Sequence, residues 1–484
     1  MNNDGNVFLI GFLVYSTAMI WLGWYVSRNQ KSSDDFLLGG RSLPMFLTLG
    51  TTVATMVGTG SSMGAVGFGY SNGWAGMLYG LGGAIGTLLL ALLFAPVRNL
   101  RFMTMSEEIS YYTGGSHLVK NIVGLLIFLA CLGWLGAHIL GGSMYLSWAT
   151  GISLTVSKLI IALAFTIYVV IGGYSAVVWT DTIQALILFF GFILMAVLSV
   201  VKAGGMDAMS LAVDPAALSF FAVDKLGVVP AMSLAMVICV GVLATPSLRQ
   251  RIYSGKDVIS VRRSFTYTGI LYLFFSALPA VIGMAAFSMN PNLENSNYAF
   301  LFATSLLPSF LGLIVLIAGL SATMSSASSD AIAGVSIMMR DLYTMIMGRM
   351  PNEQQSILYS RIFLIITIGL ALIFALTDND IISYITKMIS TIMSGLFICS
   401  ILGRFWSRFN WQGALSAIVG GAITSFAVLI NDSWIAFWGN PCIPSVIISL
   451  ACGIIMTLLT PPNRLSREEA LALITSEREN TSLN

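Results

Sequence analysis

The segment TTVATMVGTGSSMGAVGFG (Thr51 to Gly69) lies within a long apolar run and yet is rich in Gly, Ser and Thr. A helix weakened inside a membrane is tolerated where it borders protein or a wet cavity, and transporters use such breaks to expose carbonyls and helix ends to ions and solutes. The seventh apolar run carries a similar weak point at Gly241, Thr245 and Pro246. The same glycines would also let helices pack closely in an ordinary bundle. Thr51 to Gly69 is therefore expected to be either a broken helix at a binding site or a close-packing face.

The composition of the whole chain points to a membrane protein. It has 484 residues, of which 57% are apolar and 9% are charged, and its mean hydropathy is +0.87. A soluble globular protein carries about 25% charged residues and cannot keep so much apolar surface away from water. No long polar interval divides the apolar runs, so we expect a single transmembrane domain over residues 1–462. A short amphipathic tail, 463–484, is expected in the cytoplasm, solvated or at the membrane surface.

Thirteen apolar stretches come close to the roughly 20 residues that a helix needs to cross a bilayer. They predict an all-α polytopic membrane protein. The second and seventh stretches, which hold the two weak points, are five apart, and this is the offset of two inverted five-helix repeats with the first, twelfth and thirteenth stretches outside them. The predicted spans are 6–27, 44–71, 74–97, 121–148, 157–176, 181–202, 227–247, 265–288, 300–335, 361–377, 381–402, 411–430 and 433–459.

The distribution of Lys and Arg between the spans indicates which way the chain faces. Basic residues gather in cytoplasmic loops, and an outside N-terminus with a cytoplasmic C-terminus puts all but four of the 23 basic residues on the cytoplasmic side. The exceptions are Lys158, Lys202, Lys225 and Lys387. We expect a multi-pass protein of a plasma membrane of the bacterial inner-membrane type. Glu107 and Glu108 fall in a cytoplasmic loop, where we expect them to be solvated partners of neighbouring arginines.

Several classes of function are excluded by what the sequence lacks. The net charge is +2 and the basic residues are scattered, so nucleic acid is not an expected partner. The five cysteines lie singly, without the pairing of a metal site or a disulfide framework. No GxxxxGK[ST] loop is present, which argues against an ATP-driven pump. We therefore do not expect an enzyme, and the sequence predicts no particular oligomeric state.

The ninth span carries a cluster of hydroxyls in AGLSATMSSASSDAIAG. At about 100° per residue, Ser325, Ser326, Ser328 and Ser329 share one side of a helix within an arc of about 160°. Sodium is a hard cation that prefers oxygen ligands, and hydroxyls with freed carbonyls bind it without leaving a full charge in the membrane. Serines at this spacing can also pack helices together or bond to their own backbone. Four hydroxyls on one arc favour an ion site.

Two ionisable residues within the spans are further candidates. Asp181 opens the sixth span in VVWTDTIQALILFF, where it could bind an ion or only cap the helix N-terminus. His138, in LGWLGAHILGG, is the only histidine within a predicted span. It could contact a solute or relay protons, or it could be a hydrogen-bonded packing residue.

With its thirteen spans, interrupted second span and serine-rich ninth span, the chain resembles the sodium:solute symporter family. The resemblance covers essentially the whole chain. It is carried by three blocks in the right order: FLLGGRSLP (Phe36 to Pro44), GGYSAVVWTDTIQ (Gly172 to Gln184) and SSASSDAIAGVSIMMRDLY (Ser325 to Tyr343). It implies a leucine-transporter-type fold of inverted five-helix repeats that works by alternating access, with Na⁺ as the coupling ion.

The resemblance also implies where sodium binds. Carried over by position, the family's shared sodium site would use the carbonyls of Ala54, Val57 and Ala322 with the hydroxyls of Ser325 and Ser326. Some members hold a second sodium ion with an aspartate and neighbouring serines. The positions that match this second site are Asp181, Ser325, Ser328 and Ser329.

One departure concerns the solute. Proline-transporting members have an acidic residue in the broken helix, where this chain has Met56, which weakens a proline assignment. The candidate substrate-binding residues include no unpaired arginine or acid at mid-depth, which favours a small neutral, zwitterionic or monocarboxylate solute. These candidates are Thr55, Thr59, Ser61, Ser62, Tyr79, Trp134, His138, Ser390, Thr391 and Ser394.

The function expected from the sequence is sodium-coupled symport. Sodium would bind from outside and complete a pocket for an amino acid or a monocarboxylate-like solute, which is imported by alternating access. The expected partners are thus the lipid bilayer, sodium ions and a small-molecule substrate. A proton-coupled transporter of the same fold is an alternative. So is an uncoupled solute channel or sensor, although the sequence shows no repeated charged ring or carbonyl filter.

Overall fold

The computed structural model describes residues 2–28, 33–348, 351, 353–376 and 379–482, and in these residues it forms helices and no β-strand. The helices are α1 (Asn2–Ser27), α2 (Ser33–Leu38), α3 (Met45–Met56), α4 (Ala65–Asn72), α5 (Met77–Leu89), α6 (Met105–Tyr112), α7 (His117–Thr150), α8 (Leu154–Lys202), α9 (Met206–Ala212), α10 (Val223–Leu226), α11 (Val228–Ala244), α12 (Pro246–Ser254), α13 (Val258–Phe275), α14 (Ala277–Met289), α15 (Ala299–Ser305), α16 (Ser309–Ile337), α17 (Thr344–Met347), α18 (Glu353–Ala375), α19 (Ile381–Met388), α20 (Ser394–Phe405), α21 (Trp411–Leu429), α22 (Asp432–Trp438), α23 (Cys442–Leu459) and α24 (Arg467–Ser482). Short π-helical turns are η2 (Gly60–Gly64), η4 (Leu90–Phe94), η9 (Met338–Tyr343) and η10 (Ile389–Met393), and short 3₁₀ turns are η1 (Gly39–Arg41), η3 (Gly73–Gly76), η5 (Ala95–Leu100), η6 (Pro215–Leu218), η7 (Phe220–Ala222) and η8 (Ser296–Tyr298).

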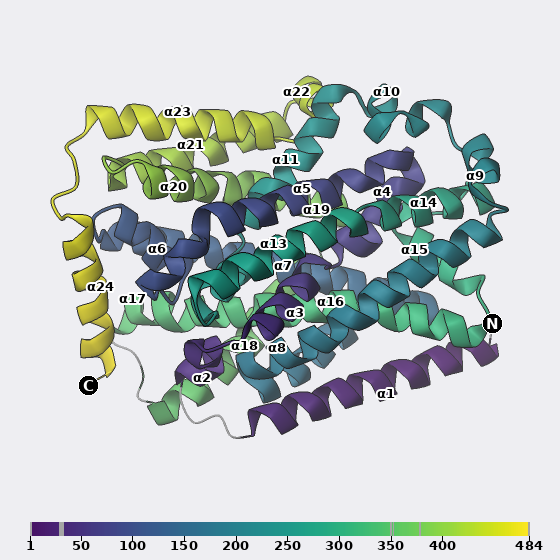
Figure 1. The fold of residues 1–484 in the computed structure, drawn as a ribbon, viewed down its shortest axis with the longest axis horizontal. Coiled ribbons are helices and arrows are strands. Elements are labelled where there is room, and N and C mark those ends of the chain that lie inside the picture. Colours follow the sequence, from purple (N-terminus) through teal and green to yellow (C-terminus); the bar gives the residue numbers. More distant parts are fainter. Residues whose placement is uncertain (1, 29–32, 349–350, 352, 377–378, 483–484) are drawn as a thin grey trace.

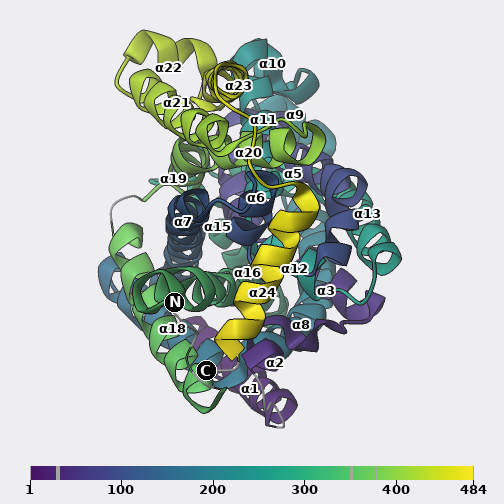
Figure 2. The same cartoon turned by 90° about the vertical axis from the view of Figure 1, so that its left-hand side faces the viewer.

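The long helices run along one common direction, and several short elements lie at the two ends of this bundle (Figure 1). We call the end with α9, α10, α15 and the N-terminus the N-terminal end, and the end with α2, α6 and α24 the α24 end. Figure 2 shows α24 lying across the α24 end, with α21 and α23 at the edge of the bundle opposite α1. These three long helices are the ones that the sequence places outside the five-helix repeats.

The number of helices that are long enough to cross a membrane differs from the number of predicted spans. Ten helices of the described chain are long and apolar enough to cross a membrane, or eleven if the bent pair α11 and α12 is one span. The 49-residue helix α8 is broken at Gly173 (φ 59°, ψ −169°). A hydrogen bond between Tyr168 and Thr180, which a straight helix would hold too far apart, shows that the chain bends sharply there. The count of thirteen is not confirmed by these lengths and stays a prediction.

Both predicted breaks are present. Helix α3 ends at Met56, Val57 is non-helical (φ −89°, ψ 67°), and the chain resumes a helical path at Gly60. Helices α11 and α12 meet at 43°. Proline lacks an N–H and disfavours a helical conformation in the residue before it, and Thr245 accordingly takes an extended conformation before Pro246. The break within Thr51 to Gly69 is thus present, and a binding site at this break stays a prediction.

The expectation that Glu107 and Glu108 are solvated partners of neighbouring arginines is wrong. Both side chains are buried, because α6 inserts between other elements at the α24 end and does not extend into solvent. Arg249 Nη1 lies 3.1 Å from Glu108 Oε1, and Tyr253 donates to Glu108 Oε2 at 2.6 Å. Sequence reasoning missed this pair because Arg249 is distant in the chain and follows the break at Pro246.

Replacing Arg249 by Met is expected to lower the free energy of unfolding by about 3–5 kcal/mol, because Glu108 is left buried without its charge partner. Arg262→Met, which removes an exposed arginine, serves as the matched control and should change stability by no more than about 0.5 kcal/mol. Thermal unfolding in detergent micelles measures both variants. A wild-type midpoint for Arg249→Met would contradict the stabilising role of the pair.

Candidate functional site

The end of α3 and the middle of α16 are joined by hydrogen bonds between hydroxyls and carbonyls. Because α3 stops at Met56, the carbonyls of its last turn lack the N–H partners that a continuing helix would supply. Ser325 Oγ donates to the Ala54 carbonyl at 3.0 Å, and Ser326 Oγ donates to the Thr55 carbonyl at 3.1 Å. Four of the five residues predicted for the first sodium site therefore meet here, since the Ala322 carbonyl also lies 3.3 Å from Ser325 Oγ.

The groups gathered at this junction suit a hard monovalent cation. They are neutral oxygens, and Ala54, Val57, Ala322, Ser325 and Ser326 are at most 1% exposed. Neutral carbonyl and hydroxyl oxygens are typical ligands of sodium at a broken helix. Val57 lies directly after the end of α3, although none of the described hydrogen bonds joins its carbonyl to the serines. Each hydroxyl can keep its oxygen lone pairs available to an ion by turning its proton away.

The residues predicted for a second sodium site are only partly brought together. Asp181 Oδ2 accepts from Ser329 Oγ at 3.1 Å. The Ser328 hydroxyl instead donates to the Ser325 carbonyl of its own helix at 3.0 Å. Asp181 lies well inside α8, so it does not cap a helix N-terminus. Within the described chain its Oδ1 atom has no hydrogen-bond partner.

Two residues beside Asp181 were missed by sequence reasoning. Thr51 donates to Asp181 Oδ2 at 2.6 Å, and Arg251 Nη2 lies 3.2 Å from the same oxygen. Arg251 also donates to Ser329 Oγ, and its side chain is fully buried. The positive-inside rule counts this arginine among the loop residues, and only the turn of α12 carries it back to α8 and α16. A protein-borne cation therefore lies at the position expected for a second sodium ion.

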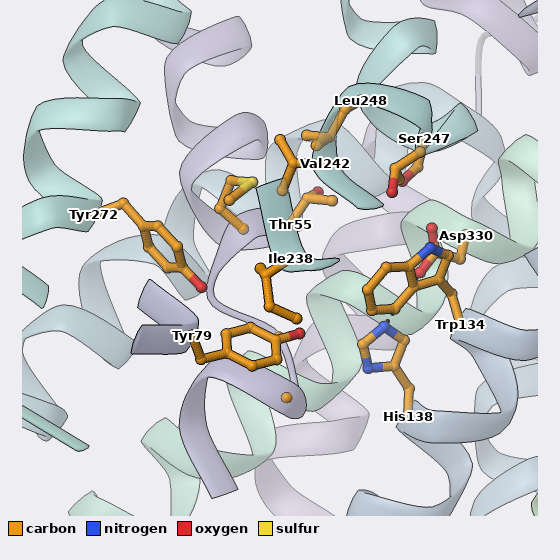
Figure 3. Close-up of a pocket in the computed structure, with 14 residues that line it drawn as sticks. Thr55, Tyr79, Trp134, His138, Ile238, Val242, Ser247, Leu248, Tyr272 and Asp330 are labelled. Carbon is orange, nitrogen blue, oxygen red and sulfur yellow. Dashed lines mark hydrogen bonds and ion pairs between the residues drawn. The ribbon is translucent and has the colours of Figure 1, made fainter. Parts of the chain in front are cut away.

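A cavity lies at the centre of the bundle, between the two broken helices and α7, α13 and α16 (Figure 3). Its volume is about 40 Å³, which is space for a few water molecules. A solute of amino-acid size thus requires the walls to move apart. The lining residues are Thr55, Met56, Gly58, Gly60, Tyr79, Trp134, His138, Ile238, Val242, Thr245, Ser247, Leu248, Tyr272 and Asp330.

Four of the ten predicted substrate residues line this cavity: Thr55, Tyr79, Trp134 and His138. A fifth, Thr59, lies directly behind it, with Oγ1 at 2.9 Å from His138 Nδ1. The hydroxyls of Ser61 and Ser62 donate to carbonyls at the break in the second span. The remaining three predicted residues lie away from the cavity lining: Ser390 and Thr391 on η10, and Ser394 at the start of α20.

The cavity also holds an acid, which the sequence analysis did not expect. Asp330 lines the cavity and is 3% exposed, and its Oδ2 atom lies 3.2 Å from His138 Nε2. Figure 3 shows these two residues and Trp134 on one side of the cavity, with Tyr79 and Tyr272 on the other. The signal was present in the sequence, because Asp330 follows Ser326 by four residues and so lies one helical turn along the same face. Asp330 is not among the predicted substrate residues, so its place in the cavity was missed, and its bond to His138 means that it is not an unpaired acid.

The two ends of the bundle differ in openness around this cavity. A second cavity of about 530 Å³ opens toward the N-terminal end and is lined by Gly64, one turn beyond Gly60, and by Asp380 and Lys387. Toward the α24 end, the buried pairs Arg251–Asp181 and Arg249–Glu108 cross the bundle. Buried ion pairs therefore lie on the α24 side of the central cavity, and a third cavity of about 410 Å³, lined by Glu107, Lys120 and Arg340, lies at that end of the bundle.

Comparison with known proteins places this geometry in context. The sequence profile of the sodium:solute symporter family matches residues 36–421. The sodium/proline symporter of Salmonella typhimurium (strain LT2) is 27% identical over 437 residues, which cover 86% of each chain. The sodium/pantothenate symporter of Escherichia coli (strain K12) is 25% identical over 472 residues, which cover 91% of this chain and 94% of that protein.

Solved structures show the same fold. A Na⁺-coupled sialic acid symporter, in a substrate-bound outward-open state, matches with a TM-score of 0.79 at 21% identity, covering 95% of this chain and 98% of that chain. Mhp1, a nucleobase-cation-symport-1 family transporter in a closed conformation, matches with a TM-score of 0.58 at 12% identity, covering 90% and 98%. The architecture is thus the leucine-transporter type.

Gly58 is expected to tolerate no side chain, because a Cβ atom there would lie 2.7 Å from Ser326 Oγ and 3.0 Å from His138 Cε1. Gly58→Ala should push α3 and α16 apart and lower the free energy of unfolding by about 1–3 kcal/mol. The matched control is Gly369→Ala in α18, where nothing lies within 4 Å of the added atom. Thermal unfolding should show this control to be neutral or stabilised by up to about 1 kcal/mol, and equal losses in both variants would count against the close approach.

Proposed function

Because the chain belongs to the sodium:solute symporter family, we propose that its coupling sodium ion binds where the broken end of α3 meets the hydroxyls of α16. The protein is a sodium-coupled symporter of a small organic solute, carried across the membrane by the leucine-transporter-type fold. The observation that supports the ion site is the meeting of carbonyls and hydroxyls at Ala54, Thr55, Ser325 and Ser326.

The proposed ligands are the carbonyls of Ala54, Val57 and Ala322 and the hydroxyls of Ser325 and Ser326. When sodium is bound, it supplies a positive charge that holds carbonyls of α3 and α16 at one point. The two hydroxyls then point their oxygens toward the ion and donate their protons elsewhere. Binding would fix the break in the second span against α16, next to the central cavity, and in this way favour solute binding.

The orientation of the protein follows from the charges at its α24 end. Arg98 donates to the Arg41 carbonyl, Arg404 to the Leu93 carbonyl and Arg467 to the Gly403 carbonyl at this end of the bundle. We assign the α24 end to the cytoplasm and the N-terminal end to the outside of a bacterial-type plasma membrane. The larger cavity then faces outward, and the buried pairs close the route to the cytoplasm.

The direction of coupling follows from the membrane potential. Each sodium ion that moves inward contributes about 2.3 kcal/mol per 100 mV, apart from its concentration gradient. One ion at the α3–α16 site is enough to drive accumulation. The relatives are transporters and not enzymes, and we extend this non-enzymatic role to the present chain.

A second sodium ion fits less well. At the Asp181 cluster the guanidinium of Arg251 already neutralises the carboxylate, with Nη2 at 3.2 Å from Asp181 Oδ2. The Asp181–Ser325–Ser328–Ser329 site would require Arg251 to move away. We therefore assign sodium coupling to the first site.

Ser326→Ala is expected to remove the sodium-specific stabilisation of the purified protein, because the ion loses a hydroxyl ligand. A ligand that binds only the folded state stabilises it by about 2.7 kcal/mol at 100 times its Kd. The measurement is thermal unfolding in sodium or potassium at equal ionic strength and fixed pH. Ser143→Ala, which removes a buried hydroxyl whose one hydrogen bond in the described chain goes to the Leu140 carbonyl of its own helix, should keep the full sodium response.

Uptake into proteoliposomes tests the same assignment as transport. Wild type should concentrate a solute when a sodium gradient is imposed and fail to do so with potassium, and Ser326→Ala should fail with both. Uptake that follows a proton gradient without sodium would favour the proton-coupled alternative. Equilibration without accumulation would indicate a channel.

Asp181→Asn is expected to keep the sodium-specific rise in the unfolding midpoint, because Asp181 lies outside the assigned ion site. The variant should nevertheless have a lower free energy of unfolding in both salts, by about 3–5 kcal/mol, because Arg251 is left buried without its charge partner. The comparison uses the sodium-minus-potassium difference for each variant. Loss of that difference in Asp181→Asn would contradict the assigned site and indicate that sodium binds at the Asp181 cluster.

A further inference from the structure

Asp330 lies in the central cavity with one oxygen engaged and one oxygen without a partner. Its Oδ2 atom bonds to His138 Nε2, while its Oδ1 atom has no hydrogen-bond partner within the described chain. We propose that Asp330 Oδ1 binds the protonated amino group of the carried solute, so that the solute of this symporter is an amine-bearing molecule such as an amino acid. This inference rests on the proposed function, in which the central cavity holds the solute.

The burial of Asp330 supports a ligand for the free oxygen. A carboxylate can accept hydrogen bonds at both oxygens, and a buried acceptor without a donor loses hydration free energy. Asp330 is 3% exposed, and its side chain lines the cavity and is not packed away behind another helix. An ammonium group has three N–H donors and can supply both the missing hydrogen bond and the opposite charge.

His138 fixes the direction in which Asp330 points. Its Nε2 atom lies 3.2 Å from Asp330 Oδ2, and its Nδ1 atom lies 2.9 Å from Thr59 Oγ1, which in turn donates to Thr323 Oγ1. This chain of contacts anchors Oδ2 to the wall between α7, α16 and the broken second span. The other oxygen is buried at the cavity wall without a hydrogen-bond partner in the described chain, so that it becomes available to a solute when the walls move apart.

The remaining walls fit an organic cation better than a metal ion. Tyr79, Trp134 and Tyr272 present aromatic rings to the same space, and such rings attract ammonium groups through their negative faces. No cluster of three or more His, Cys, Asp or Glu that could hold a metal is present among the described residues. Trp134 Nε1 also has no partner in the described structure, so the same wall offers a donor to an acceptor group of the solute.

The apolar part of the lining limits the solute further. Ile238, Val242 and Leu248 come from the broken seventh span and its flanks, and they offer no hydrogen bonds to the many hydroxyls of a sugar. Met56, at the end of α3, also lines the cavity, whereas Asp330 supplies an acid from α16. The cationic group of the solute would thus be held by α16.

The test is thermal unfolding of the purified full-length protein in saturating sodium, with a panel of solutes. The panel contains the common L-amino acids, the N-acetyl derivative of each, the matching 2-hydroxy acids, simple monocarboxylates and neutral sugars. N-acetylation keeps the carbon skeleton and removes the charge on nitrogen. We expect stabilisation by one or more amino acids and none by the corresponding N-acetyl and 2-hydroxy compounds.

Variants then locate the effect. For a stabilising amino acid, Asp330→Asn should raise the apparent Kd about 30-fold or more, while Asp330→Glu, which keeps the carboxylate, should lose less. The matched control is Asp341→Asn in η9, which removes a buried carboxylate held by Ser106 outside the cavity. It should keep the wild-type Kd. If Asp330→Asn does not fold, the wild-type comparison of each amino acid with its N-acetyl derivative still decides.

Three results with the solute panel would overturn the proposal, and a fourth concerns sodium alone. The three are stabilisation only by solutes without a protonated amino group, stabilisation by no member of the panel, and an unchanged Kd in Asp330→Asn. Loss of the solute-free sodium response in Asp330→Asn would also overturn it, because Asp330 would then belong to the ion site. Failure of the proposed function is distinguishable, since the wild-type protein would then show no sodium-specific stabilisation in the absence of solute.

Discussion

The hydrogen bonds from Ser325 and Ser326 to the carbonyls of Ala54 and Thr55 are the interaction on which the centre of the molecule depends. A helix that stops inside a membrane leaves carbonyls with no water to solvate them, at a cost of several kcal/mol each. Helix α16 offers hydroxyls at the depth where α3 ends. The break is thereby stabilised, and it can border a cavity, which an unsatisfied helix end could not do.

One helix serves three neighbouring polar groups because its polar residues repeat at a spacing of four. Ser325 and Ser329 lie one turn apart, as do Ser326 and Asp330. The first pair faces α3 and the Asp181–Arg251 cluster of α8 and α12. The second pair runs from the end of α3 to the central cavity. The proposed ion site and the proposed solute site are thus adjacent on α16, which would give their coupling a physical basis.

The parts of the site that could be predicted are those that follow directly from the local sequence. Gly and Pro weaken a helix wherever the chain places them, so the breaks at Met56 and Thr245 were predictable. The meeting of α3 and α16 required the resemblance to a known family. Asp330 stood in the quoted motif without an assigned role, because its partner His138 is 192 residues away. Ser390 and Ser394 were chosen for polarity alone and lie away from the cavity.

The sequence by itself determined the class of protein, the apolar helices, the two breaks and the hydroxyl face of α16, because these follow from composition and from spacing along one helix. Only the tertiary structure decided which charges meet. Arg249 and Arg251 read as loop residues, yet the turn at Pro246 carries them to Glu108 and Asp181. Pairing of this kind depends on which residues of distant helices lie at the same level of the bundle. The periodicity of residues along one helix carries no information about contacts between distant helices.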